Sequence, residues 1–325
     1  MTSAAMIISV LLVTTLFGVV SAARPPYPSE CASAGDPNPS LRRDKLTVLM
    51  NGFSESRIPL LRSLAATYAF SPTVSSVLVL WGNPSTAPRV TLQLARNLSL
   101  SSPKISLLRQ RTPSLNNRFL PRPNDIATDA VLICDDDVEV DPTSLEFAFR
   151  VWTRNPTRII GLFARSHDLD LDRKSWVYTV HPDRFSIILT KFMILKTHYL
   201  FLYTCHPRMA HVREAVDLVR NCEDILMNFL VANETDAGPI LVGAKKVRDF
   251  GDKRNEKGSD ENQSVSGVGL SSRKGEHGKR RGWCIGEFHR VLGRMPLRYS
   301  YGKVVDSIRE QGLCHKGGKL VFCDQ

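Results

Sequence analysis

The sequence predicts an α/β protein in which a mostly parallel sheet is flanked by helices. Between residues 46 and 134, short apolar runs rich in β-branched residues alternate with segments of helical periodicity, which is the pattern of βαβ units. Polar residues follow several of the apolar runs directly. Because the carboxyl ends of parallel strands line the ligand crevice of such sheets, the same pattern predicts where a functional site lies. With 325 residues, 42% of them hydrophobic, the chain can bury a large core.

The first half of the chain carries four expected strands separated by helices. Turn residues end the first two strands at Asn51-Gly52 and at Gly82-Asn83-Pro84, and the acidic run Asp135–Asp137 directly follows the fourth. Periodicity places the strands at 46–50, 77–81, 105–108 and 130–134, and the helices at 57–71 and 87–100.

The second half is less regular. His167 and His181 are expected at polar surface or loop positions, and Trp81 and Trp152 in the core. Residues 251–281 contain almost nothing to bury and are expected to form a mobile loop. Stretches prone to form strands lie at 159–163, 176–181 and 240–244, and helical patterns at 190–196, 210–218 and 222–233.

An uncharged apolar stretch lies near the start of the chain. Residues 4–23 match the roughly 20 residues that cross a bilayer, so we expect the chain to enter the secretory route. Val20-Ser21-Ala22 resembles a signal-peptidase site, so residues 1–23 are expected to be a transmembrane anchor or a cleaved signal peptide. An ordinary buried helix is the less favoured alternative, because such helices rarely stand at the N-terminus without polar positions. Residues 24–44 are rich in Pro, Ser and Gly and are expected to be a stem. Residues 45–325 then form one folded domain.

The secretory route would allow the seven cysteines to oxidise. Because seven is odd, at least one of them is free or paired with another chain. The sequence contains no CxxC pair and no His/Cys cluster at zinc spacing, which argues against a structural zinc site. Asn97, Asn233 and Asn262 begin glycosylation sequons and become candidate glycan acceptors.

The formal net charge of +11 points to an anionic partner, which could be nucleic acid, a membrane surface or a phosphorylated substrate. The sequence pI of about 9.5 and the basic run Lys279-Arg280-Arg281 suggest nucleic-acid binding. No aromatic residues interleave with that run, however, and the apolar N-terminal stretch directs the chain away from nucleic acid. A membrane or a phosphorylated substrate is therefore the better interpretation.

The run Asp135-Asp136-Asp137 after an apolar strand is the feature that most specifically indicates chemistry. Three adjacent carboxylates repel one another, and keeping them ionised at a strand end needs a cation. Aspartate oxygens suit hard ions such as Mg²⁺ or Mn²⁺, which often bridge carboxylates and a substrate diphosphate. Alternation along a strand lets Asp135 and Asp137 face one way and Asp136 the other. We interpret the acidic run as part of a nucleotide-diphosphate site; a solvated acidic turn is the alternative.

Several segments together resemble glycosyltransferase family 64, the exostosin-like α-glycosyltransferases. The resemblance runs from about Leu46 to Tyr299 and is carried by SLNNRF at 114–119, CDDD at 134–137, LEFAFRVW at 145–152 and NCEDILMNF at 221–229. A closer similarity, to the plant glycosylinositol phosphorylceramide mannosyltransferase branch, is carried by NGFSESRIP at 51–59, LWGNPST at 80–86, VHPD at 180–183, GLSSR at 269–273 and GGKLVFCD at 317–324.

The resemblance implies a GT-A-type nucleotide-diphospho-sugar transferase fold, with merged donor and acceptor subregions, and transfer with retention of anomeric configuration. It implies a divalent ion, Mn²⁺ or Mg²⁺, on Asp137 and Asp135, with Asp135 and Asp136 also at the nucleotide sugar. It places the catalytic carboxylate on Asp224, a basic residue near the donor diphosphate on Arg281, and a disulfide between Cys222 and Cys284. The remaining donor contacts fall on Asn51, Arg57, Asn83, Asn117 and Arg118.

The plant branch implies transfer of mannose from GDP-mannose to the head group of glycosylinositol phosphorylceramide sphingolipids. The chain would then be a single-pass type II protein of the Golgi membrane with a luminal catalytic domain. Around residues 54–57 the sequence has one residue more than the animal enzymes, which leaves the choice between guanosine and uridine open. A UDP-sugar-dependent N-acetylhexosaminyltransferase of the exostosin-like type is therefore the alternative, and a silent scaffold that kept the fold is a further one.

Overall fold

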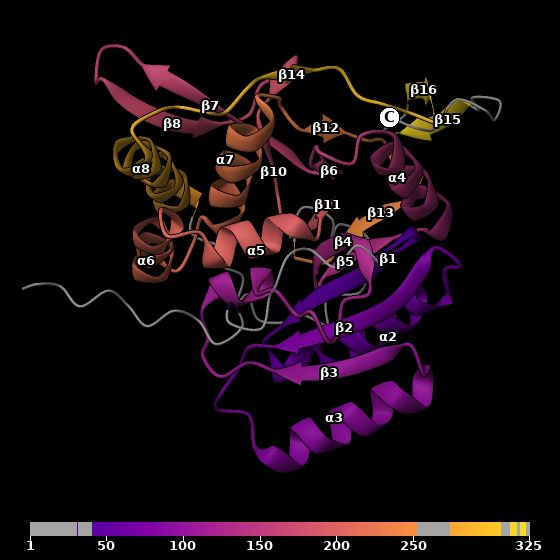
Figure 1. Cartoon of the computed structure of the whole chain (residues 1–325). Coiled ribbons are helices and arrows are strands. Elements are labelled where there is room, and N and C mark those ends of the chain that lie inside the picture. The colour runs from indigo at the N-terminus through magenta and orange to yellow at the C-terminus, as the bar shows by residue number, and fades with distance from the viewer. Residues whose placement is uncertain (1–30, 32–40, 252–273, 307–312, 317–318, 323–325) are drawn as a thin grey trace, which may run out of the picture.

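The computed structural model describes residues 31, 41–251, 274–306, 313–316 and 319–322. Its centre is a seven-stranded sheet of order β12-β6-β11-β4-β1-β2-β3 (Figure 1). Neighbouring strands pair in parallel except at β11, which runs antiparallel to both β4 and β6. The α/β fold class with a mostly parallel sheet is confirmed. The strands are β1 Arg42–Gly52, β2 Val74–Trp81, β3 Ile105–Arg109, β4 Thr128–Asp135, β6 Ile160–Gly161, β11 Phe192–Lys196 and β12 Ile240–Leu241.

Helices cover both faces of this sheet because alternate strand residues point to opposite sides. Leu46, Val48 and Met50 of β1 belong to one core, together with residues of α2 Ile58–Phe70, α3 Pro88–Ser101 and α4 Pro142–Arg154. Leu49 belongs to the other core, with residues of α5 His198–Cys205, α6 Met209–Val219, α7 Glu223–Thr235 and α8 Lys274–Leu292.

Smaller strand pairs and two short 3-10 helices complete the described fold. The largest of these sheets has the order β10-β7-β8, and its β7–β8 hairpin extends outward beside α8 (Figure 1). The bounds are β7 Ala164–Asp170, β8 Ser175–Thr179 and β10 Ile187–Ile188; β5 Val138–Val140 with β13 Val247–Asp249; β9 Arg184–Phe185 with β14 Ser300–Tyr301; β15 Leu313–Lys316 with β16 Lys319–Phe322; and the 3-10 helices η1 Glu55–Arg57 and η2 Leu115–Phe119.

The strands and helices expected in the first half are all present, with strand starts up to four residues earlier than the apolar runs. Strand β1 begins at Arg42, so the last residues expected in the stem already pair in the sheet. The first three residues of this strand are polar and exposed, so a search for hydrophobic patterns cannot detect them. Trp81 and Trp152 are almost fully buried, as predicted.

The prediction of a helix over 190–196 is wrong, because Phe192–Lys196 form strand β11. Its apolar residues from Phe192 to Leu195 are all buried, with Phe192 and Ile194 in one core and Met193 and Leu195 in the other. A strand buried on both faces shows no polar alternation, so its sequence resembles that of a buried helix.

Two further expectations need correction. Residues 274–281 of the expected loop 251–281 are the first turns of helix α8, and 252–273 lie outside the described residues.

His167 is not a surface residue: it lies in β7, is 5% exposed, and its ring stacks on Tyr299 at 4.7 Å between centroids. Its Nδ1 lies 2.7 Å from the Ser186 hydroxyl, which satisfies the buried imidazole. His181, by contrast, is partly exposed and pairs with Asp168.

The expected anchor or signal peptide, residues 1–23, lies outside the described residues, as does most of the expected stem. Cys31 is described, and it forms a disulfide with Cys205 at the end of α5. Within the described ranges, no helix has both the length and the apolar content needed to cross a membrane.

Candidate active site

The carboxyl ends of β1 and β4 bring together two of the expected site residues. In the parallel register of these strands Asn51 lies opposite Asp135. Strand β2 ends on the other side of β1, where the Gly82 amide donates to the Gly52 carbonyl at 2.8 Å. The Asp135–Asp137 run therefore lies at the carboxyl-terminal ends of the central strands, as the sequence predicts.

Arg57 binds two carboxylates of this run. Its Nη1 lies 2.9 Å from Asp136 Oδ1 and 3.0 Å from Asp137 Oδ2. The short helix η1, directly after β1, places the guanidinium there. Asp136 and Asp137 are both buried, so the arginine compensates charge that water cannot reach.

Asp137 retains an unsatisfied oxygen. Its Oδ1 is buried and has no hydrogen-bond partner among the described residues. Burial, reinforced by the neighbouring carboxylate of Asp135, raises the pKa of Asp137 to about 6. An unpartnered buried carboxylate oxygen beside a second carboxylate is a donor set that suits a hard divalent cation. The residues present therefore fit Mn²⁺ or Mg²⁺, although the described ranges hold no group of three or more His, Cys, Asp or Glu side chains arranged for a metal.

Arg118 links the acidic run to the start of helix α7. Its Nη1 lies 3.1 Å from Asp135 Oδ1 and 3.4 Å from Glu223 Oε1, and the side chain is only 5% exposed. Burial raises the pKa of Glu223, and the charge of Arg118 opposes that rise. One buried guanidinium thus holds carboxylates from β4 and α7 at a single site.

Two expected donor contacts have other partners. Asn83 Oδ1 accepts from the Ser85 amide at 3.0 Å, and Asn117 Nδ2 donates to the Thr112 carbonyl at 2.8 Å. Both amides therefore stabilise their own loops. No hydrogen bond joins either to the acidic run among the described residues.

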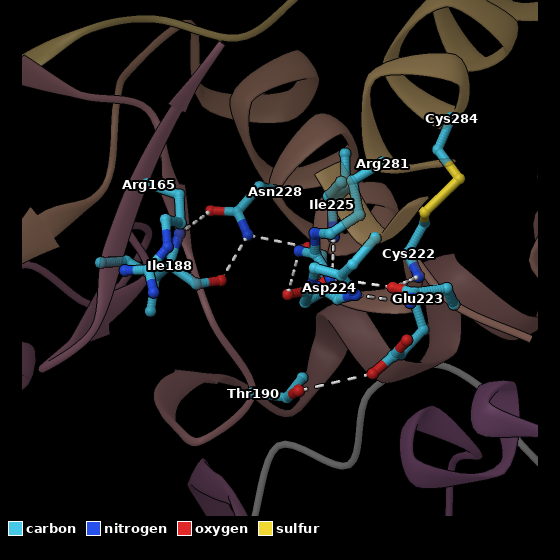
Figure 2. Close-up of polar contacts among 12 residues, drawn as sticks. Arg165, Ile188, Thr190, Cys222, Glu223, Asp224, Ile225, Asn228, Arg281 and Cys284 are labelled. Atoms are coloured by element: carbon cyan, nitrogen blue, oxygen red, sulfur yellow. Dashed lines mark hydrogen bonds and ion pairs between the residues drawn. A yellow bond between two sulfur atoms is a disulfide. The ribbon is translucent and has the colours of Figure 1, made fainter. Parts of the chain in front are cut away.

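Asp224 and Arg281 form a buried ion pair at the other side of the site. Arg281 Nη2 lies 2.6 Å from Asp224 Oδ2, and its Nη1 donates to Asn221 Oδ1 at 2.9 Å. The Cys222–Cys284 disulfide is present and joins the start of α7 to α8, as Figure 2 shows. It brings together two side chains that are 57 positions apart in sequence.

Asn228 positions Asp224 from one turn further along α7. Its Nδ2 donates to the carbonyls of Asp224 and Ile188, each at 2.8 Å, and its Oδ1 accepts from the Ile188 amide at 3.0 Å (Figure 2). The Asp224 carboxylate also accepts from the Ile225 amide at 2.8 Å. At the N-terminus of a helix the macrodipole stabilises such a negative charge.

Sequence reasoning missed Glu223 and Tyr178. Glu223 stands in the Asn-Cys-Glu-Asp segment, and that place in the segment was a signal that could have found it. Tyr178 had no signal of its own, because its role depends on how β8 packs on α8. The Arg281 guanidinium lies over the Tyr178 ring at 4.4 Å from the centroid, a cation–π contact.

Comparisons with known proteins identify the family of this chain. A family model described as the glycosyl transferase family 64 domain matches residues 46–309. Glycosyltransferase family protein 64 C3 of Arabidopsis thaliana is 58% identical over 307 residues, which cover 90% of this chain and 92% of that protein.

Two further relatives carry more specific names. Exostosin-1 of Bos taurus is 34% identical over 248 residues, 74% of this chain but only 30% of that protein. Glycosylinositol phosphorylceramide mannosyl transferase 1 of Arabidopsis thaliana is 30% identical over 279 residues, 82% of this chain and 77% of that protein.

Among solved structures, one titled "Crystal structure of GalNAc-T7 with UDP, GalNAc and Mn2+" has a TM-score of 0.44 and 8% identity. It covers 58% of this chain and 40% of that chain, a likeness too low to support a mechanism. The family model matches most of this chain, and the similarity to the first relative covers nearly the whole length of both proteins. This chain therefore belongs to glycosyltransferase family 64 and is a glycosyltransferase.

Proposed function

We propose that this chain transfers mannose from GDP-mannose to the head group of glycosylinositol phosphorylceramide sphingolipids. The observation that carries the proposal is the bridge of Arg118 from Asp135 to Glu223, because it unites the acidic run with the Asp224–Arg281 pair. The similarity to the Arabidopsis mannosyl transferase supports this donor and acceptor, since it extends over 77% of that protein, compared with 30% of exostosin-1.

The residues have complementary roles in the proposed reaction. The bond between sugar C1 and the donor phosphate oxygen breaks, and a bond from C1 to an acceptor hydroxyl oxygen forms. Arg281 offsets the negative charge that develops on the leaving diphosphate. Asp224 either stabilises the positively charged sugar or attacks C1, and the acceptor proton passes to a carboxylate or to the departing phosphate.

A divalent cation would be held by Asp137 and Asp135. When bound, it would supply further neutralisation of the diphosphate charge. Asp136, Arg57 and Arg118 lie around these two carboxylates and are proposed donor contacts. Asn51, Asn83 and Asn117 are proposed donor contacts at the strand ends and the neighbouring loop.

The proposed location follows from the acceptor and from the apolar residues 4–23. A lipid acceptor requires the enzyme to work at a membrane, and an N-terminal segment of this length can anchor it there. We place the enzyme in the Golgi membrane with its catalytic domain in the lumen.

The decisive experiment measures nucleotide release by the full chain with Mn²⁺, supplied with GDP-mannose or with UDP-N-acetylglucosamine. We expect release of GDP from GDP-mannose, its loss on chelation, and its loss in Asp224→Asn. Asp125→Asn, which alters an exposed carboxylate, is the matched control and should keep the wild-type rate. Preferential release of UDP would show that the donor is a UDP-sugar and not GDP-mannose. No release of nucleotide from either donor would refute the proposal.

A further inference from the structure

A groove that the proposed reaction does not use lies between helix α4, strand β12 and the segment that follows β14. Its volume is about 610 Å³. Residues 300–305 form its outer wall. Val304 forms a parallel β-bridge with Val242, directly after β12, and Asp306 pairs with Arg150 of α4 (Figure 1). These two contacts hold the wall in place across the edge of the central sheet.

The groove lies toward the amino ends of the central strands, whereas the acidic run lies at their carboxyl ends. Ile160 of β6 pairs with Ile194 of β11, and Ile194 pairs with Leu132 of β4. Because β11 is antiparallel to both neighbours, β6 and β4 run in the same direction. Arg158 lines the groove and stands two residues before Ile160, so it lies on the opposite side of Leu132 from Asp135. The groove is therefore separate from the proposed donor site.

The described residues that line this groove include three cations and no carboxylate. The cations are Arg154, Arg158 and Lys303. None of the three forms an ion pair with any residue in the described ranges. A hollow lined by one sign of charge concentrates the electrostatic field and attracts the opposite charge. The groove is thus complementary to an anion.

Arg158 is held in place for such an anion. Its Nε donates to the Gly238 carbonyl at 2.7 Å. Its Nη2 donates to the Pro239 carbonyl and to the Ser300 hydroxyl, each at 3.2 Å. Its Nη1 donates to no described residue, and burial lowers the pKa of the guanidinium without an opposing carboxylate. A guanidinium fixed in this way can donate to a phosphate oxygen with little further ordering.

Apolar side chains lie beside these cations. Phe147 and Val151 of α4 line the groove. At its outer wall Tyr301 is 70% exposed, and Val304 and Val305 are each 42% exposed. Surfaces that meet a membrane combine these features, because aromatic rings lie at the level of the head groups and cations attract anionic lipids. An anion with an apolar part therefore fits this groove better than a simple ion.

We propose that this groove binds the head group of an anionic phospholipid and so holds the folded domain against the membrane surface. Arg154, Arg158 and Lys303 bind the phosphate, while Tyr301 and the neighbouring valines contact the acyl chains next to it. Inorganic phosphate would meet the cations alone. The proposal goes beyond the proposed function, because it depends neither on the nucleotide sugar nor on the glycan that accepts the sugar.

The test measures binding of three soluble probes to the full chain by calorimetry. Dihexanoylphosphatidic acid carries a phosphate and short acyl chains, dihexanoylphosphatidylcholine carries the same chains on a zwitterionic head group, and inorganic phosphate carries charge alone. We expect the phosphatidic acid to bind about tenfold or more tightly than either other probe. Inorganic phosphate that binds equally well would show a site for a free anion and overturn the lipid assignment. Equal binding of the two lipids would overturn the role of the cations.

Single variants make the test specific. Arg154→Gln and Lys303→Gln each remove an exposed cation that has no described partner, so both should fold as the wild type does. Each should bind the phosphatidic acid about tenfold more weakly, the loss expected for one charged hydrogen bond. Tyr301→Ser should weaken both lipids and leave inorganic phosphate unchanged. Arg96→Gln is the matched control: this exposed arginine lies on α3, next to β3 at the other end of the sheet, and the variant should bind as the wild type does.

The affinity for GDP in the presence of Mn²⁺ is measured on the same proteins. It should be unchanged in Arg154→Gln and Lys303→Gln, because the groove is separate from the acidic run. A loss of GDP affinity in place of lipid affinity would assign these cations to the donor site and overturn the proposal. Nucleotide release is recorded separately: its absence, with intact and variant-sensitive lipid binding, would refute the proposed function and support the lipid site.

Discussion

At the scale of single residues, the Asp224–Arg281 ion pair is buried, with side chains only 4% and 7% exposed. Replacing Asp224 by Asn leaves a buried guanidinium without its counter-charge, which costs about 3 kcal/mol or more. We expect Asp224→Asn to lower the free energy of unfolding by that amount, measured by urea denaturation. Turnover should fall by about a hundredfold or more, because the carboxylate is lost from the reacting centre.

A double variant separates stability from catalysis at this pair. Exchanging both partners for apolar residues, Asp224→Leu with Arg281→Met, removes the unpaired charge and should recover much of the lost stability. Activity should stay absent. Recovery of turnover together with stability would mean that the pair serves folding alone.

His167 predicts a pH dependence of stability. Burial lowers the pKa of His167 to about 4, from 6.5 for an exposed histidine. The unfolded chain therefore takes up a proton at a higher pH than the folded chain, so stability falls as the pH drops from about 6.5 toward 4. At pH 5 this one group should cost about 2 kcal/mol.

The measurement compares urea unfolding of the wild type and of His167→Gln at pH 7.5 and pH 5. The comparison is needed because burial raises the pKa of Asp137 and of Glu223, and a raised carboxyl pKa gives the opposite slope. We expect the wild type to lose about 2 kcal/mol more than the variant on acidification. A parallel loss in both proteins would contradict the assignment.

At the scale of elements, two glycines of helix α8 form a matched pair. A Cβ at Gly282 would lie 2.7 Å from the Trp176 carbonyl oxygen of β8, whereas a Cβ at Gly278 would meet nothing within 4 Å. Gly282 therefore permits the close approach of α8 to β8. Because Arg281 precedes it, this approach also sets where the guanidinium lies relative to Tyr178 and Asp224.

We expect Gly282→Ala to destabilise the protein by about 1–3 kcal/mol, the usual cost of overpacking, and to reduce turnover by displacing Arg281. Gly278→Ala should instead stabilise it by up to about 1 kcal/mol, since alanine favours the helix. Thermal unfolding and nucleotide release on both variants check this. Equal effects of the two substitutions would show that α8 does not depend on the contact with β8.

Elements of the first half were predictable from the sequence because strands and helices there alternate with clear periodicity. Asn51 and Asp135 came together for the same reason, since parallel strand ends meet at one edge. Strand β11 was not predictable, because it is buried on both faces. Tyr178 could not be found either, since its place depends on an antiparallel ladder and on the packing of α8, which leave no local pattern.

At the scale of the whole molecule, the site has two halves of different origin. The sheet supplies Asp135–Asp137 at strand ends, and α7 with α8 supplies Asp224 and Arg281. Physical reasoning on the sequence found the first half. The second half followed only from family resemblance, because residues 57 positions apart meet through a disulfide that no local pattern indicates. Arg118 joins the halves, so a ligand on one should stabilise the other.

This coupling leads to a prediction for the stability of the full chain. Mn²⁺ with GDP at about a hundred times their dissociation constant should stabilise the folded chain by about 2.7 kcal/mol, which raises the Tm by about 5 °C. Asp137→Asn removes the buried carboxylate whose Oδ1 has no partner. We expect this variant to be at least as stable as the wild type without ligand and to lose the Mn²⁺-dependent shift, whereas Asp125→Asn, an exposed carboxylate, should keep it. Differential scanning fluorimetry measures all three proteins, and an unchanged shift in Asp137→Asn would remove Asp137 from the metal site.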